Sequence, residues 1–249
     1  MSAREMYRII QPVRLGRDRF ESFCFSRGLK VQRKVSLYRT TNSLGVTRFA
    51  NLIKDREVTG VNQVWVSDIT YYRIRERFYF LTFITDLGSR RILGHAVSAT
   101  MLTEETTIPA LVMAFETRKG VRPTILHSDG GGQYYCKAFL SLTRPDIRNS
   151  MGKEAYDNPN AERINGQIKN DYLIHYNPQT LQELVVQTDR AVMNYNLKRH
   201  SAIKQSPLEF ELSTNEQLST KEKKNQKKKI LHYLNRFVLP SKKVNAIQA

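Results

Sequence analysis

Several residue types are scarce in this sequence, and each scarcity argues against a class of protein. Only two cysteines occur, Cys24 and Cys136, and they lie far apart in no paired spacing. This argues against a disulfide framework and a cysteine zinc site, and it favours a reducing compartment. The chain has no run of about 18 uncharged apolar residues and no apolar segment of signal length near its start. We therefore expect a cytoplasmic protein with no membrane role.

Acidic residues are scarce relative to basic ones. The sequence has 23 Asp and Glu residues against 40 Lys and Arg residues, a formal net charge of +17. Basic side chains that neutralise phosphates release counterions, so this excess predicts a polyanionic partner, and nucleic acid is the expected one. With 249 residues, 40% of them apolar, the chain can bury a full core in one large domain, with or without a small appendage.

The first quarter of the chain is the most basic block. Helical patterns at residues 7–10 and 17–27 predict a small helix-turn-helix whose second helix presents Arg17 and Arg19 to DNA. The alternative is a solvated helical hairpin that only packs on the rest of the chain. The basic, hydroxyl-rich segment 33–44 is expected to be a linker that can lie along a phosphate backbone.

A strand pattern begins after this block. Val64, Val66 and Asp68 alternate with the residues between them, so they are predicted to share one face of a strand. An ionised carboxylate on a face with two valines is costly unless it is paired or bound to a metal, which makes Asp68 a candidate functional residue. Residues 78–86 and 91–97 predict two more strands, and the short turns between them predict an antiparallel meander.

The apolar period then changes to that of a helix. Residues 108–115 follow it, and Glu104 and Glu105 are predicted to lie in the first turn of this helix. A short apolar run then ends at Asp129 and three glycines, which predicts a buried strand with Asp129 at its carboxyl edge. His127 could orient a site there, although a lone histidine at a strand end is more often structural.

The second half of the chain supplies a third carboxylate. A helix at residues 135–142 and a strand at 147–150 are predicted first, and Pro159 then suits the first turn of a further helix. A capping box at Thr180 and Glu183 opens another amphipathic helix. On the helix that begins at the proline, a polar stripe lies beside the apolar one. Its members are Glu162, Asn165 and Lys169.

Asp68, Asp129 and Glu162 together offer hard oxygen ligands without His or Cys, which suits Mg²⁺ or Mn²⁺. Two such ions, about 4 Å apart, stabilise the attacking and leaving oxygens of a phosphoryl displacement. We expect Lys169 to hold a phosphate beside the metals and Asn165 to contact DNA, the alternative for Lys169 being an exposed helix lysine. After the glycines, Gln133 and Tyr134 could contact an unpaired base, or they could simply begin the next helix.

The order of short motifs makes this hypothesis specific. The motifs are Trp65–Tyr71, Thr85–Arg90, His127–Asp129 with Gln133–Tyr134, Ser150–Met151, Asp157–Asn158 with Ala161–Glu162, and Tyr195–Asn196 with His200, Ser201 and Pro207. In this order they resemble the catalytic core of bacterial insertion-sequence transposases, which belong to the wider group of DDE transposases and retroviral integrases. The resemblance is strong over residues 61–212 and is looser over residues 7–51. It is greatest to the second-reading-frame product of elements that make their full transposase by frameshifting.

The resemblance implies an α/β fold with a ribonuclease-H-like integrase core, in which helices flank a mixed five-stranded sheet. A small helical, helix-turn-helix-like segment precedes this core. We divide the chain into a DNA-binding segment and linker at residues 1–45, a catalytic core at 58–212 and a lysine-rich tail at 213–249. Asp68 and its two partner carboxylates match the metal-binding triad of the family.

The implied function is DNA transposition, by metal-dependent DNA strand cleavage and strand transfer. The expected cofactor is Mg²⁺, as two ions, with Mn²⁺ able to substitute. The expected partners are double-stranded DNA at the element's ends and at the target, other copies of the chain, and the first-reading-frame product. The expected location is the bacterial cytoplasm, at the nucleoid. The alternatives are an inactive DNA-binding remnant or regulator of the element, and a ribonuclease or junction resolvase on the same fold.

The chain departs from the family pattern in two ways. Asp129 and Glu162 are separated by 32 residues, a few fewer than the family has, which predicts a shortened connection around residues 143–157. Met1 also aligns inside the helix-turn-helix region, so we expect an internal start.

Overall fold

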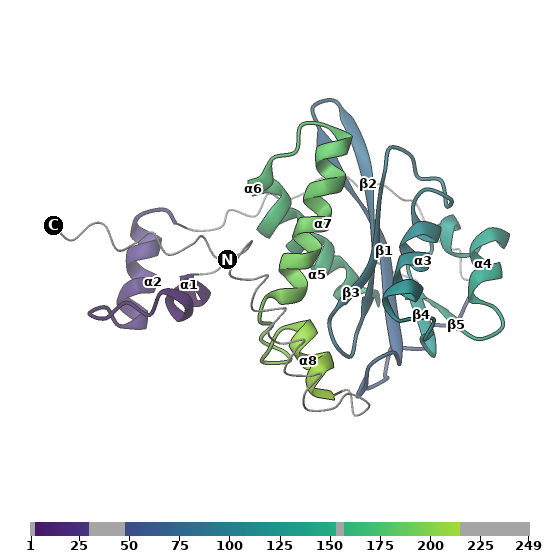
Figure 1. The fold of residues 1–249 in the computed structure, drawn as a ribbon, viewed down its shortest axis with the longest axis horizontal. Helices are drawn as coiled ribbons and strands as arrows, with labels where there is room; N and C mark the ends of the chain where they lie inside the picture. Colours follow the sequence, from purple (N-terminus) through teal and green to yellow (C-terminus); the bar gives the residue numbers. More distant parts are fainter. Residues whose placement is uncertain (1–2, 30–47, 153–156, 215–249) are drawn as a thin grey trace. The chain divides into compact units, whose positions relative to one another are not determined.

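The computed structural model describes residues 3–29, 48–152 and 157–214 (Figure 1). The chain forms two compact units, Met1–Thr40 and Thr41–Ala249, which are described separately. Three predicted features lie wholly or partly outside the described residues: the linker at 33–44, the tail beyond residue 214, and residues 153–156 of the shortened connection.

The first unit contains two short helices. They are α1 (Ala3–Ile10) and α2 (Arg17–Ser26). The rings of Tyr7 and Phe20 pack across them with centroids 5.6 Å apart. Both predicted helices are confirmed, and α1 starts earlier than the pattern indicated.

The second unit is built on a five-stranded sheet with the strand order β3-β2-β1-β4-β5. The first three strands form an antiparallel meander, and β4 and β5 run parallel to β1. The strands are β1 (Val64–Ile74), β2 (Arg77–Asp86), β3 (Ile92–Ser98), β4 (Ile125–Ser128) and β5 (Arg148–Met151). The predicted meander and the predicted ribonuclease-H-like mixed sheet are both confirmed.

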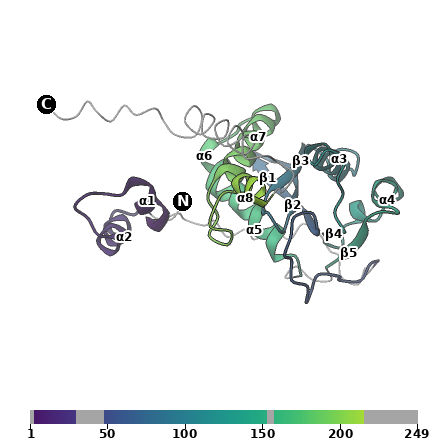
Figure 2. The ribbon, with the colours of Figure 1, turned by 60° about the horizontal axis from the view of Figure 1, so that its bottom comes forward.

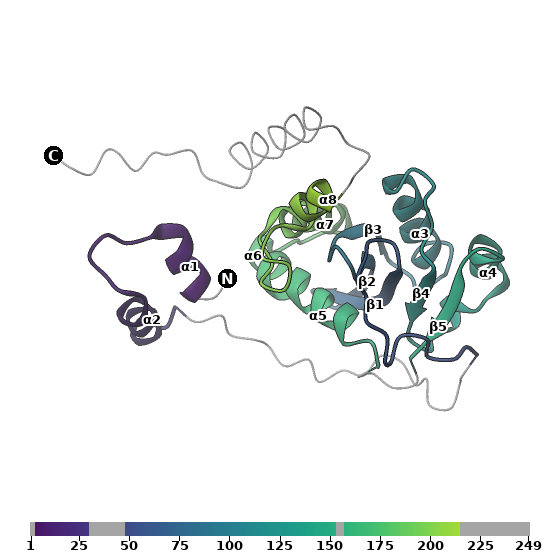
Figure 3. The ribbon, with the colours of Figure 1, turned by 90° about the horizontal axis from the view of Figure 1, so that it is seen from below.

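Helices cover both faces of this sheet (Figures 1, 2 and 3). One layer holds α3 (Thr107–Thr117), the short 3₁₀ helix η1 (Gly132–Tyr134) and α4 (Lys137–Thr143). The other holds α5 (Pro159–Gln167), the π-helical segment η3 (Ile168–Leu173), α6 (Ile174–Tyr176), α7 (Leu181–Leu197) and α8 (Pro207–Thr214). The predicted start of α5 at the proline is confirmed. The single helix expected after it instead widens into a π-helical turn.

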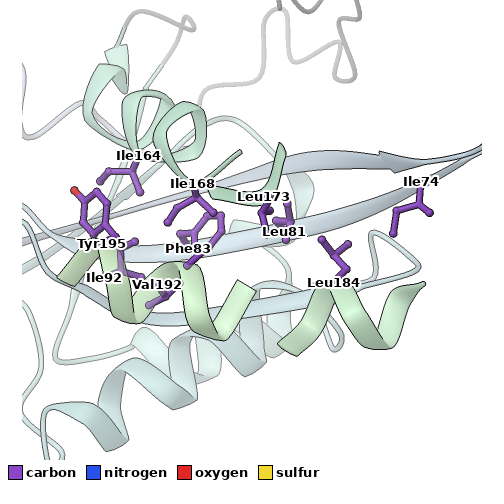
Figure 4. Close-up of a cluster of buried hydrophobic side chains, with 11 residues drawn as sticks. Ile74, Leu81, Phe83, Ile92, Ile164, Ile168, Leu173, Leu184, Val192 and Tyr195 are labelled. Atoms are coloured by element: carbon purple, nitrogen blue, oxygen red, sulfur yellow. The ribbon is translucent and has the colours of Figure 1, made fainter. Parts of the chain in front are cut away.

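The α5 face of the sheet carries the larger core cluster (Figure 4). Phe83 and Leu81 of β2 pack there against Ile168 and Leu173 of η3 and Leu184 of α7. Asp68 pairs with Phe83 in the β1–β2 register, and directly paired residues point to the same side of a sheet. Asp68 therefore lies on the α5 face.

The residues of β1 that alternate with Val64 and Val66 point to the other face of the sheet and pack in the core beneath α3. Trp65 is fully buried with Leu111 of α3, whereas Val64 and Val66 pack with Ala161 of α5. The predicted period of two is thus confirmed. It places the two valines and Asp68 on one face.

One detail of α3 differs from the expectation. Glu104 and Glu105 were placed in its first turn, but the helix begins at Thr107 and has no acidic residue there. The Glu105 carboxylate instead accepts hydrogen bonds from the hydroxyls of Ser98, at 2.6 Å, and Thr100, at 2.8 Å. Two nearby hydroxyl donors therefore replace the helix N-terminus as its partners.

A buried ionic network closes one end of the sheet. Asp86 is fully buried and accepts hydrogen bonds from the backbone N–H of Asn62 and of Gly88, each at 2.8 Å, and from Arg118 Nη2 at 2.9 Å. Arg118 also pairs with Glu211 of α8. Asp86, the aspartate of the Thr85–Arg90 motif, therefore links β2 to α3 and α8 through Arg118. It is a structural residue, paired as a buried charge must be.

Crossing a lipid bilayer requires a long, apolar helix, and the helices in the three described ranges are shorter or more polar than this. None of them meets that requirement.

Candidate active site

Two of the three candidate carboxylates lie at the same level on neighbouring strands. β1 and β4 pair in parallel with Val66 opposite His127. Asp68 and Asp129 each lie two residues beyond this pair. Asp129 directly follows the last residue of β4, so its carboxylate is presented at the carboxyl edge of that strand, where parallel sheets place their functional groups.

Helix α5, which lies beside β1 (Figure 3), carries the third carboxylate, Glu162, in its first turn. Ala161 packs with Val64 and Val66 of β1, and Glu162 is the next residue along the helix. One turn later, Asn165 Nδ2 donates a hydrogen bond to Asp68 Oδ2 at 2.8 Å. The helix is therefore anchored directly on the candidate site.

A second amide fixes the beginning of α5. Asn158 is buried and its Nδ2 donates to the backbone oxygen of Ser67 at 3.0 Å. In the sequence, Asn158 stands out only as part of the Asp157–Asn158 motif. An Asn-Pro pair signals a turn or a helix start, but the acceptor lies 91 residues away and no local pattern indicates it.

The three carboxylates influence one another electrostatically. Burial, followed by the negative charges of Asp129 and Glu162, raises the pKa of Asp68 to about 8. Burial also raises the pKa of Asp129, against the effect of the Gly131 N–H, which donates to Asp129 Oδ1 at 3.1 Å. Burial likewise raises the pKa of Glu162. The site thus concentrates negative charge in a poorly solvated place, and a bound cation would relieve the repulsion.

The carboxylates do not form a closed cage. Within residues 3–29, 48–152 and 157–214, no three His, Cys, Asp or Glu side chains already surround a common point as metal ligands. Glu162 is exposed, so its side chain can turn toward the two aspartates without unpacking the core. The arrangement suits a site that tightens when its ligands bind.

Lys169 lies beside the carboxylates. Its Nζ donates to Thr70 Oγ1 at 2.7 Å and lies 5.2 Å from the centroid of the Tyr71 ring. Thr70 is two residues beyond Asp68 on β1. Burial lowers the pKa of Lys169, and the Asp68 charge opposes this effect. The lysine is therefore held partly buried against β1, which differs from the alternative of an exposed helix lysine.

The predicted base contact by Tyr134 is wrong for this structure. The Tyr134 side chain is 2% exposed, its hydroxyl lies 2.9 Å from Ser67 Oγ, and its ring packs edge-on against Phe139. A ring enclosed in the core cannot stack on a base. Gln133 is half-buried and its amide donates to the backbone oxygen of Met101 at 3.1 Å, so its contact with DNA stays a prediction.

Two other candidate residues, Asn165 and His127, contact other side chains inside the fold. Asn165 is 5% exposed and donates to Asp68, so the structure gives it an intramolecular partner in place of the predicted DNA contact. His127 is fully buried with Nδ1 2.8 Å from Ser150 Oγ, and burial lowers its pKa to about 4. This favours the structural interpretation of His127. Arg17 and Arg19 are exposed on α2 of the first unit, and their contact with DNA stays a prediction.

Comparison with known proteins gives three related findings. Residues 58–153 match the family described as "Integrase core domain". The "Insertion element IS600 uncharacterized 31 kDa protein" of Shigella sonnei is 33% identical over 167 residues, which are 65% of this chain and 61% of that protein. "Transposase InsF for insertion sequence IS3A" of Escherichia coli (strain K12) is 37% identical over 121 residues, which are 47% of this chain and 42% of that one. The chain therefore spans between two fifths and three fifths of the length of these relatives.

A solved structure supports the fold. A chain of the simian T-cell lymphotropic virus intasome, determined in complex with the PP2A regulatory subunit B56 gamma, superimposes with a TM-score of 0.55. The match covers 88% of this chain and 76% of that chain at 18% sequence identity. The superposition agrees with the mixed sheet, residues 58–153 match the integrase core domain family, and the chain is similar to insertion-sequence proteins that include a transposase.

Proposed function

We propose that this chain is the catalytic part of a DDE transposase, which cuts DNA at the ends of an insertion sequence and transfers the freed strands to target DNA. The observation that carries the proposal is the placement of Asp68 and Asp129 at one level of β1 and β4, with Glu162 within their electrostatic reach. The relationship to insertion-sequence transposases supports the same reaction.

The donor set fits divalent cations of the Mg²⁺ type, with Mn²⁺ able to replace it. All three candidate ligands, Asp68, Asp129 and Glu162, are carboxylates, and hard cations prefer such oxygens. The high pKa of Asp68 reflects burial among like charges, a cost that cation binding removes. Two bound ions would supply activation of the attacking oxygen and stabilisation of the leaving oxygen.

The protein's own groups hold this site in shape. Asn165 donates to one oxygen of Asp68, and the Gly131 N–H donates to one oxygen of Asp129, so both carboxylates are held in place by groups of the protein. Lys169 carries a positive charge next to Thr70, on the strand of Asp68, where it can hold the phosphate that flanks the reacting bond. No protein nucleophile is required, because a water or a sugar hydroxyl attacks the phosphorus directly.

The partners follow from this reaction. The net charge of +17 supports binding of double-stranded DNA, both at the element's ends and at the target. Two ends must be cut and joined together, so the active complex contains more than one copy of the chain. The first-reading-frame product of the element is a further partner, and the place of action is the bacterial cytoplasm at the nucleoid. Cleavage of a labelled duplex that carries the repeats flanking the gene, measured with Mg²⁺ and with EDTA for wild type and Glu162→Gln, tests the proposal.

A further inference from the structure

We propose that Arg90 and Arg163 form a binding site for a backbone phosphate of the DNA, beside Glu162 on α5. The inference rests on the proposed function and adds to it a place where the DNA strand lies. Within the described residues, no hydrogen bond or ion pair joins either arginine to Asp68, Asp129 or Glu162.

The two side chains come from different elements to one stretch of α5. Arg90 follows β2 in the turn before β3, where its backbone adopts a left-handed φ of 62° and its N–H donates to the Asp86 oxygen at 2.8 Å. Its Nη1 donates to Asn160 Oδ1 on α5 at 2.7 Å. Arg163 is three residues beyond Asn160, so the two share a face of the helix. The anchored guanidinium of Arg90 thus lies within about one helical turn of Arg163.

The charges of the two arginines act on the same neighbours. Arg90 and Arg163 both oppose protonation of His200, and both oppose the burial that raises the pKa of Tyr195. These two rings lie together, with centroids 4.4 Å apart and His200 Nε2 3.0 Å from the Tyr195 carbonyl oxygen. Both guanidinium groups therefore lie close enough to Tyr195 and His200 for their charges to act on this pair of rings.

This positive charge is not neutralised within the described residues. Lys198, which acts on the same histidine, pairs with Asp171 at 3.6 Å. No carboxylate in residues 3–29, 48–152 or 157–214 forms an ion pair with Arg90 or Arg163. Arg163 is exposed and Arg90 is half-buried, so both can be reached from solvent.

A phosphate is the ligand that this pair suits best. A guanidinium offers five N–H donors in a planar fork, which matches two oxygens of a phosphate. The bond to Asn160 uses one donor of Arg90 and limits its motion, so little side-chain entropy is lost on binding. Arg163 directly follows Glu162 on α5, so we place the bound phosphate on the DNA strand whose reacting bond lies at the carboxylates.

The test is DNA binding without metal, which separates this site from the reaction. Fluorescence anisotropy of a labelled duplex in EDTA, over a series of salt concentrations, compares wild type with Arg163→Ala, Arg163→Lys and Asn160→Ala. Arg122→Ala is the matched control, because Arg122 lies before β4 and already pairs with Asp146 at 3.6 Å. Thermal melting of each variant confirms that it is folded.

For Arg163→Ala we expect affinity to fall by about fivefold to tenfold at 0.1 M salt, and the slope of log K against log salt to fall by about one unit. Arg163→Lys should keep the slope with a smaller loss of affinity. Asn160→Ala should weaken binding, because it releases Arg90, and Arg122→Ala should match the wild type.

Unchanged affinity and slope in Arg163→Ala and Asn160→Ala overturn the inference. If Glu162→Gln meanwhile abolishes cleavage, the proposed function stands and only the phosphate site falls. A wild-type chain that binds no duplex at any salt concentration overturns both.

Discussion

Asp68 and Asp129, which are 61 residues apart in the sequence, each lie two residues beyond the paired residues Val66 and His127 of adjacent parallel strands. The sheet register therefore brings two carboxylates to the same level. Burial of Asp68, together with the charges of Asp129 and Glu162, raises the pKa of Asp68 to about 8.

Asp68→Asn should stabilise the metal-free protein at pH 8. The folded pKa of Asp68 is about 8 and its ordinary value is 3.8, so the folded state holds a proton that the unfolded state releases. Stability from this group is therefore complete below pH 4 and is lost as the pH rises toward 8. Removing the carboxylate should raise the free energy of unfolding at pH 8 by roughly 1–3 kcal/mol, with little change at pH 4.

Denaturant unfolding in EDTA at several pH values measures this difference. Asp146→Asn is the matched control, because Asp146 is 60% exposed and lies away from the site. It should change stability by the same small amount at every pH. A difference between wild type and Asp68→Asn that does not grow with pH contradicts the assigned repulsion.

Mg²⁺ or Mn²⁺ should raise the melting temperature of the wild-type chain. A ligand that binds only the folded state stabilises it by about 2.7 kcal/mol at a concentration one hundred times its Kd. Asp129→Asn should abolish the shift, because it removes a ligand that follows β4 directly. Asp146→Asn should retain it. An equal shift in wild type and Asp129→Asn would place the cation elsewhere on the chain.

Asn165→Ala should weaken metal binding without removing a ligand. Asn165 Nδ2 holds Asp68 Oδ2 at 2.8 Å, and loss of a group that orients a metal ligand costs about 10-fold to 100-fold in metal affinity. Titration of Mn²⁺ by calorimetry, or by its electron paramagnetic resonance signal, gives the Kd directly. Asn170→Ala is a suitable control, since Asn170 lies nearby in η3 and has no bond to the carboxylates. Equal Kd values for Asn165→Ala and wild type contradict a positioning role.

Tyr134→Phe should lower stability and leave DNA affinity unchanged. The substitution removes the hydroxyl that lies 2.9 Å from Ser67 Oγ in a buried place, which costs about 1 kcal/mol. Denaturant unfolding measures the cost, and anisotropy of a labelled duplex measures affinity. Stability equal to the wild type, with weaker DNA binding, would restore Tyr134 as a DNA contact.

Each of the three candidate carboxylates carries a local signal in the sequence, and the order of the surrounding motifs singles them out among the 23 acidic residues. Asp68 continues a period of two, Asp129 ends an apolar run before glycines, and Glu162 follows the proline that starts a helix. Such signals involve residues within one element, so they survive in a sequence without any knowledge of the fold.

The errors involve residues whose partners are distant in sequence. The buried hydroxyl of Tyr134 contacts that of Ser67, which is 67 positions away in the sequence. Asn165 is hydrogen-bonded to Asp68, which is 97 positions away. Tertiary contacts decide such cases, and the local pattern does not contain them. Glu105 is a different case, because the hydroxyls that bind it, of Ser98 at the end of β3 and of Thr100, lie only a few residues before it.

The most direct test of the account is strand cleavage and joining on a labelled duplex that carries the repeats flanking the gene, in Mg²⁺, with and without the first-reading-frame product. Wild type and Asp146→Asn should cut and join, whereas Asp129→Asn and Glu162→Gln should reduce the rate at least about 1,000-fold, because each removes a proposed ligand of the reaction's metal ions. EDTA should abolish the activity of all four proteins. Cleavage that persists in Asp129→Asn, or that proceeds in EDTA, would contradict the assignment of these carboxylates to the reaction.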